Sequence, residues 1–118
     1  MGSRSSMRYK VVLVPFPFDD LSGQKVRPAV CLTDSVGTHR HVVLAFITST
    51  IPPKLESSDV VLDPASPDFA QTGLRVASAL RLHRIVTVSS AIIRKQLGTL
   101  SPNVQAQVRQ RLRDLFLV

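Results

Sequence analysis

The sequence consists mainly of short β-branched segments separated by proline and glycine, and it ends in one segment with helical periodicity. This order limits the folds that the chain can adopt. Short β-branched and apolar runs predict strands over residues 9–16, 29–33, 42–48 and 59–62. A longer extended segment, residues 77–88, is predicted to bend near His83. Pro52 and Pro53 cannot donate to a strand ladder, so the chain must leave the sheet there. The pattern predicts a mainly β protein.

Two helical segments are predicted near the C-terminus. Ser101 is a candidate N-cap and Pro102 suits the first helical turn. Apolar residues then recur at helical spacing, namely Val104, Val108, Leu112, Leu115 and Phe116, with Arg109, Arg111 and Arg113 on the other side. A shorter helix is predicted over residues 91–96, capped by Ser89 or Ser90 and ended by Gly98. Many short strands and few helices favour a small barrel-like sheet with helices on it, an α+β fold.

Length and composition limit the architecture and the environment. The chain has 118 residues, and we expect one domain over residues 7–118, with residues 1–6 as an expression remnant before Met7. Hydrophobic residues make up 44% of the chain, which is typical of a globular protein. No apolar stretch approaches the ~20 residues that span a bilayer, so we expect no membrane association. A single cysteine, Cys31, cannot form an internal disulfide and fits the reducing cytoplasm.

Charge is distributed unevenly along the chain. Residues 1–68 contain seven basic and seven acidic side chains, whereas residues 69–118 contain eight basic side chains and only Asp114 as an acid. The second half therefore carries the whole net charge of +7. Such asymmetry indicates a polyanionic partner, either nucleic acid or a very acidic protein, although a solubilising surface would give the same composition.

A guanidinium and a group of hydroxyls stand at the ends of two predicted strands. Arg27 precedes Pro28, which favours an extended backbone at the start of its strand. Thr48, Ser49 and Thr50 end another strand. If both strand ends face one pocket, the pair suits phosphate chemistry. The alternatives are that Arg27 pairs with an acid of its own loop, Asp19 or Asp20, and that the hydroxyls cap backbone groups.

These residues resemble the PemK/MazF family of bacterial toxins, which cut single-stranded RNA. An Arg-Pro pair opens a strand in that family, as Arg27 does here, and Thr48 matches its paired hydroxyl residue. Further similarity lies in residues 70–74 (AQTGL), 85–88 (IVTV) and 97–101 (LGTLS). The chain departs from the family at Tyr9, where a Gly-Asp pair is usual, and at His83, where many members have an acid or an amide.

The resemblance implies a small SH3-like barrel that forms a homodimer, with RNA in a groove across both subunits. It implies a type II toxin–antitoxin toxin, an mRNA interferase that cleaves selected RNA sequences without metal or other cofactor, leaving 2′,3′-cyclic phosphate and 5′-hydroxyl ends. A cognate antitoxin with an acidic segment would block the groove, and the complex would bind DNA. Arg27 and Thr48 are the implied catalytic residues, with Arg27 stabilising charge because its pKa is too high for a general base.

Several other residues are candidates for contacting RNA. Phe18 lies beside Phe16 in a Pro-Phe-Pro-Phe loop and could stack on an unpaired base, whereas Phe16 is expected in the core. The full set of candidate RNA-binding residues is Phe18, Gln24, Lys25, Ser49, Thr50, His83 and Arg84. His83 is also a minority candidate for acid–base chemistry because imidazole titrates near neutrality.

Other functional classes remain open from the sequence. His39 and His41 lie in a predicted turn without the spacing of a metal site, so no metal is expected. A non-catalytic toxin of the same fold, similar to the gyrase-poisoning CcdB proteins, would bind a protein target and leave RNA intact. A plain nucleic-acid-binding barrel would bind in a salt-dependent way without producing new RNA ends. The Arg27 and Thr48 pair favours the nuclease.

Overall fold

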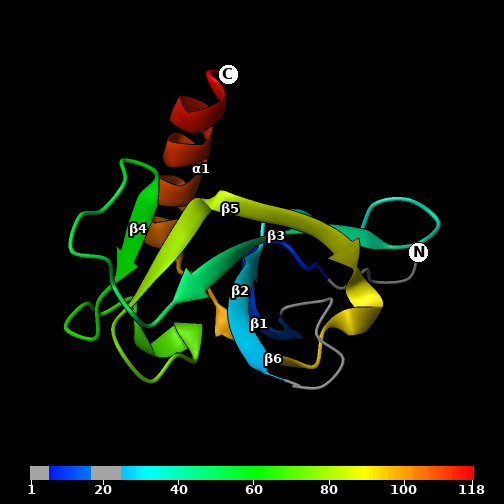
Figure 1. The fold of residues 1–118 in the computed structure, drawn as a ribbon, viewed down its shortest axis with the longest axis horizontal. Helices are drawn as coiled ribbons and strands as arrows, with labels where there is room; N and C mark the ends of the chain where they lie inside the picture. The colour runs from blue at the N-terminus through cyan, green and yellow to red at the C-terminus, as the bar shows by residue number, and fades with distance from the viewer. Residues whose placement is uncertain (1–5, 17–24) are drawn as a thin grey trace.

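The computed structural model describes residues 6–16 and 25–118 and contains one curved antiparallel sheet. Its six strands follow the order β4-β5-β3-β2-β1-β6. The strands are β1 (Lys10–Pro15), β2 (Val26–Cys31), β3 (His41–Thr48), β4 (Asp59–Leu62), β5 (Ser78–Ser89) and β6 (Lys95–Thr99). Figure 1 shows the sheet curling into a half-barrel, with the C-terminal helix α1 (Pro102–Phe116) beside β4 and β5. The predicted mainly β barrel with a terminal helix is confirmed.

One predicted helix is wrong. Residues 91–96 were predicted to be helical, but only the single 3-10 turn η2 (Ser90–Ile92) forms, with the Ser89 side chain accepting a hydrogen bond from the Ala91 N–H. The chain then becomes extended and pairs with β1 as strand β6. Ladder hydrogen bonds to β1 outweigh the weak local helix preference of this segment. The irregular connection after β4 contains the expected single turn, η1 (Ala70–Thr72).

The central strands are buried on both faces, which explains their nearly continuous apolar sequences. Alternate side chains point to opposite faces of a strand. Val11, Val30 and Ala45 therefore face a first core, which is shared with β4 and α1. Their neighbours Val12 and Leu44 face a second core, inside the half-barrel. The second core ends at the open side where the candidate site lies.

The side chains of strand β5 that face the first core and those that face the second exchange places at an irregularity, which lies at the predicted bend. Arg81 pairs with Phe46, and the next pair is Ile85 with Ala45, so residues 82–84 have no partners on β3. Before this point the even-numbered Leu80 faces the first core, and after it the even-numbered Val86 faces the second. Three extra residues reverse the alternation, as expected of an irregular insertion in a ladder.

Helix α1 begins where the sequence predicts and extends beyond the sheet. The Ser101 side chain accepts a hydrogen bond from the Val104 N–H, and a proline follows the cap. Val104 and Val108 are buried, whereas Leu115 is 38% and Phe116 57% exposed. The predicted apolar stripe is thus covered as far as Leu112, which packs against the first core, and the last turn of the helix projects past β4 (Figure 1). No helix in the described part of the chain is long and apolar enough to cross a membrane.

Two glycines allow a close backbone crossing between η1 and β6. A Cβ on Gly73 would collide with the carbonyl of Leu97, and a Cβ on Gly98 would collide with the carbonyl of Gln71. Gly73 also has a positive φ of 74°, a conformation that favours glycine. The AQTGL and LGTLS segments of the sequence are therefore packing partners.

Tyr9 occupies a left-handed backbone conformation just before β1. Its φ is 69°, its N–H donates to the Cys31 carbonyl at 2.7 Å, and its own carbonyl accepts from the Leu100 N–H at 2.9 Å. A non-glycine residue pays roughly 1–2 kcal/mol for this conformation. The Tyr9 side chain packs against the first core, which offsets that cost.

Candidate active site

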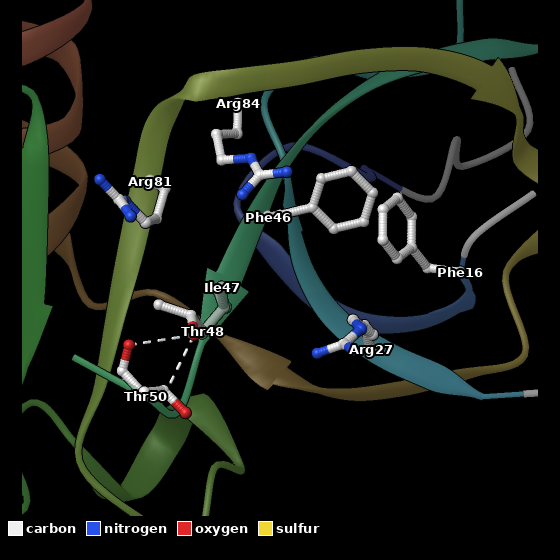
Figure 2. Close-up of a pocket in the computed structure, with 8 residues that line it drawn as sticks. All are labelled: Phe16, Arg27, Phe46, Ile47, Thr48, Thr50, Arg81 and Arg84. Atoms are coloured by element: carbon white, nitrogen blue, oxygen red, sulfur yellow. Dashed lines mark hydrogen bonds between the residues drawn. The ribbon is translucent and has the colours of Figure 1, made fainter. Parts of the chain in front are cut away.

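A pocket opens where side chains of the three strands β2, β3 and β5 meet Phe16, the residue that follows β1. Its lining consists of Phe16, Arg27, Phe46, Ile47, Thr48, Thr50, Arg81 and Arg84 (Figure 2). Strand alternation accounts for the key members. Arg27 follows the same face as Ala29 of β2, and Thr48 the same face as Phe46 of β3, because each is two residues from its partner. The sheet thereby brings the two predicted catalytic residues into one pocket.

Arg27 is exposed on the β2 side of the pocket. Its guanidinium carbon lies 5.8 Å from the centroid of the Phe16 ring, within cation–π range. Phe16 in turn packs against Phe46 with ring centroids 4.9 Å apart. Within residues 6–16 and 25–118, Arg27 forms no ion pair. Asp19 and Asp20, the alternative partners, lie outside the described residues.

The Thr48 hydroxyl takes part in a local turn. Its Oγ1 donates to the Thr50 carbonyl at 3.2 Å and accepts from the Thr50 N–H at 3.1 Å (Figure 2). The capping role considered for these hydroxyls therefore applies to Thr48 itself. Thr48 also lines the pocket, so the turn fixes the conformation of a side chain that borders the site.

Two further arginines come from β5. Arg84 was among the candidate RNA-binding residues, whereas Arg81 was missed. Arg81 pairs across the sheet with Phe46 and so shares its face. The signal that could have found it is an arginine alternating with Leu80 and Leu82, both fully buried, in an otherwise apolar strand.

Comparison with known proteins identifies the family. The model of the PemK-like, MazF-like toxins of type II toxin–antitoxin systems matches residues 7–116. The protein belongs to this family. No curated protein sequence gives a significant match.

Solved structures of similar fold cover nearly the whole chain. The Mycobacterium tuberculosis toxin MazF-mt6 is 20% identical, with a TM-score of 0.68 over 92% of this chain and 97% of that one. MazE–MazF from Deinococcus radiodurans is 21% identical, with a TM-score of 0.68 over 97% of both chains. An endoribonuclease in complex with its cognate antitoxin, from a mycobacterial species, is 14% identical with the same TM-score and coverage. At these identities the likeness shows the fold.

The other sequence candidates of this PemK-like, MazF-like chain lie in different places. Thr50 lines the pocket, whereas Lys25 and Ser49 are exposed outside its lining. Phe18 and Gln24 lie outside the described residues. Phe16, expected in the core, is half-buried and forms a wall of the pocket. Their contacts with RNA stay predictions.

In strand β5, His83 stands between the lining residues Arg81 and Arg84, but its side chain lies near Asp59. Its Nδ1 is 3.8 Å from Oδ1 of Asp59, and it does not line the pocket. Within the described part of the chain, the lining contains three arginines and no histidine or carboxylate, so this part of the site offers positive charge and hydroxyl donors but no ordinary general base. Among the described residues no cluster of His, Cys, Asp and Glu could hold a metal ion.

Proposed function

We propose that this protein is the toxin of a type II toxin–antitoxin system and cleaves single-stranded RNA at selected sequences. The observation that carries the proposal is the convergence of Arg27 and Thr48, from adjacent strands β2 and β3, on one pocket that is also lined by Arg81 and Arg84 of β5. Such a pocket suits a phosphate with developing negative charge. Family membership supports the activity because the resemblance implies RNA-cleaving toxins. The match over residues 7–116 supports one functional unit without residues 1–6.

The proposed reaction needs no nucleophile from the protein. The ribose 2′-oxygen attacks the adjacent phosphorus and forms a new P–O bond, while the bond from phosphorus to the 5′-oxygen breaks. The 2′-hydroxyl proton passes to a base, and the leaving 5′-oxygen takes up a proton, so the products are a 2′,3′-cyclic phosphate and a 5′-hydroxyl. Arg27 would stabilise the charge on the non-bridging oxygens through forked hydrogen bonds, with Thr48 as a further donor.

Partners follow from the same proposal. We infer a cognate antitoxin whose acidic segment competes with RNA for the basic pocket, since similar folds have been solved with antitoxins. We also infer a homodimer and DNA binding together with the antitoxin, as the family resemblance implies. An RNA substrate would place the activity in the cytoplasm.

The first test replaces Arg27 by alanine. Arg27→Ala should lower the rate of RNA cleavage in EDTA at least ~100-fold, because one donor to a developing oxyanion is lost. Its free energy of unfolding should change by no more than ~0.5 kcal/mol, since Arg27 is exposed. Arg109→Ala, an equal loss of charge on an exposed part of α1, is the control and should keep parent activity. Equal cleavage by parent and Arg27→Ala would remove Arg27 from the mechanism.

The same assay separates the two other classes. A toxin that traps a topoisomerase would leave RNA intact and arrest growth through the DNA enzyme. A binding barrel would retain RNA in a salt-dependent complex without producing new ends.

A further inference from the structure

Asp59 is a buried carboxylate whose two oxygens are both held by the protein. Its side chain is 0% exposed, at the first residue of β4. Oδ2 accepts a hydrogen bond from the Glu56 N–H at 2.8 Å. Oδ1 accepts one from Nε of Arg81 at 3.0 Å. A buried carboxylate fixed by backbone in this way has one orientation, so it can fix its partner too.

Arg81 connects this buried group to the pocket. Its side chain is 19% exposed and lines the pocket from the β5 side, and its guanidinium extends toward β4 and Asp59 (Figure 2). Because Asp59 takes the Nε–H, the N–H groups at the two terminal nitrogens remain for other acceptors. Nδ1 of His83 lies 3.8 Å from the same Oδ1, which is farther than a hydrogen bond. The side-chain donor to this oxygen is therefore Arg81 and not His83.

We propose that Asp59 is a positioning residue that fixes the Arg81 guanidinium as a phosphate contact on the β5 side of the pocket. RNA backbone would then be held between Arg27 on β2 and the Asp59–Arg81 pair on β4 and β5. A fixed guanidinium binds phosphate with less loss of side-chain freedom than a mobile one. This inference rests on the proposed function for its RNA ligand, but it does not need the cleavage step.

The direction in which neutralising Asp59 changes the affinity for phosphate distinguishes positioning from simple electrostatics. Asp59 is a negative charge beside a site for an anion, so its neutralisation would strengthen phosphate binding if charge alone mattered. If Asp59 positions Arg81, its neutralisation weakens binding instead. The effect must then disappear when Arg81 is absent, because residues that act through one another are not additive.

The experiment measures binding of a single-stranded 2′-O-methyl RNA, which lacks the 2′-hydroxyl nucleophile, as a function of salt. Arg81→Gln should raise Kd about tenfold and reduce the slope of log K against log salt by about 0.7, the loss of one phosphate contact. Asp59→Asn should raise Kd several-fold in the parent and leave it unchanged or lower in the Arg81→Gln background. Arg75→Gln, an exposed arginine outside the pocket lining, is the charge-matched control.

Two results would overturn the proposal: tighter or equal binding by Asp59→Asn, or the same weakening with and without Arg81. If Asp59→Asn fails to fold, the Kd of the Arg81→Lys variant tests the proposal instead. It keeps the charge but lacks the fork that serves carboxylate and phosphate together, so its Kd should rise as in Arg81→Gln, and parent affinity would contradict positioning. Because binding is measured without cleavage, an RNA that binds as predicted but is never cut would defeat the proposed function and leave this inference standing.

Discussion

Thr48 illustrates how one side chain can serve both the fold and the site. Its hydroxyl closes the turn to Thr50, and the residue lines the pocket. The hydroxyl has one proton, which the turn now directs to the Thr50 carbonyl. To donate to a phosphate, the hydroxyl must rotate, while its acceptor bond from the Thr50 N–H can persist.

This dual role predicts different outcomes for two substitutions. Thr48→Ser keeps the hydroxyl and should retain RNA cleavage within a few-fold of the parent. Thr48→Val keeps the shape but loses the donor, so kcat should fall ~100-fold or more. Initial rates on one RNA substrate, with thermal melts of both variants, give the comparison. Full activity of Thr48→Val would show that the hydroxyl only caps the turn.

Cys31 is a residue whose burial predicts its chemistry. Burial raises the pKa of its thiol to about 11, with a smaller contribution from the negative charge of Asp34. At pH 8 almost no thiolate is present, so iodoacetamide should leave the native protein unmodified and react once it is denatured. Mass spectrometry after a timed reaction measures this. Native alkylation at the rate of a free thiol would mean that Cys31 is not buried in solution.

At the scale of elements, β5 determines which side chains reach the pocket. Leu80 and Leu82 face the first core, and Val86 and Val88 the second, so the strand reverses its faces between them. Arg81 is the last paired residue before this reversal, and Arg84 is the last of the unpaired residues within it. The bend near His83 was predictable, whereas the number of unpaired residues was not, because register depends on pairing with β3.

The crossing of η1 and β6 makes a quantitative prediction about stability. Gly98→Ala should lower the free energy of unfolding by about 3 kcal/mol, because its Cβ meets backbone, which cannot move aside easily. Gly37→Ala is the control, since Gly37 has a φ of 78° but nothing within 4 Å of an added Cβ. It should cost only about 1 kcal/mol. Urea titrations of both variants measure the difference, and equal costs would contradict the close packing.

At the scale of the whole molecule, the basic half of the sequence is not one basic surface. Arg81 and Arg84 line the pocket, whereas Arg109 and Arg113 are exposed on α1. The third pocket arginine, Arg27, belongs to the electrically neutral half of the sequence. Charge asymmetry thus indicated a polyanionic partner, but the fold determines which cations converge.

Local sequence patterns predicted much of the fold and part of the pocket. Short β-branched runs and the Ser101 cap carry local information, so the strands and α1 were predicted near their observed positions. The helix predicted over residues 91–96 is wrong and includes the first two residues of β6, because the structure of that strand depends on a distant partner, β1. Arg81 was missed for a similar reason. Its place is set by cross-strand pairing with Phe46 and by buried Asp59, neither of which a local pattern reveals.

The proposed attack by the ribose 2′-oxygen makes cleavage depend on a single 2′-hydroxyl, and this dependence can be measured. Purified protein is incubated in EDTA with a long unstructured RNA, and the cuts and their ends are mapped. An oligonucleotide that contains one mapped site is then made with a single 2′-deoxy residue on the 5′ side of the scissile phosphate. We predict 2′,3′-cyclic phosphate and 5′-hydroxyl ends, and no cleavage of the 2′-deoxy oligonucleotide. The control has the same replacement one nucleotide further 3′ and should still be cleaved, because it keeps the attacking 2′-hydroxyl. Intact RNA across many sequences, or undiminished cutting without that 2′-hydroxyl, would contradict the account.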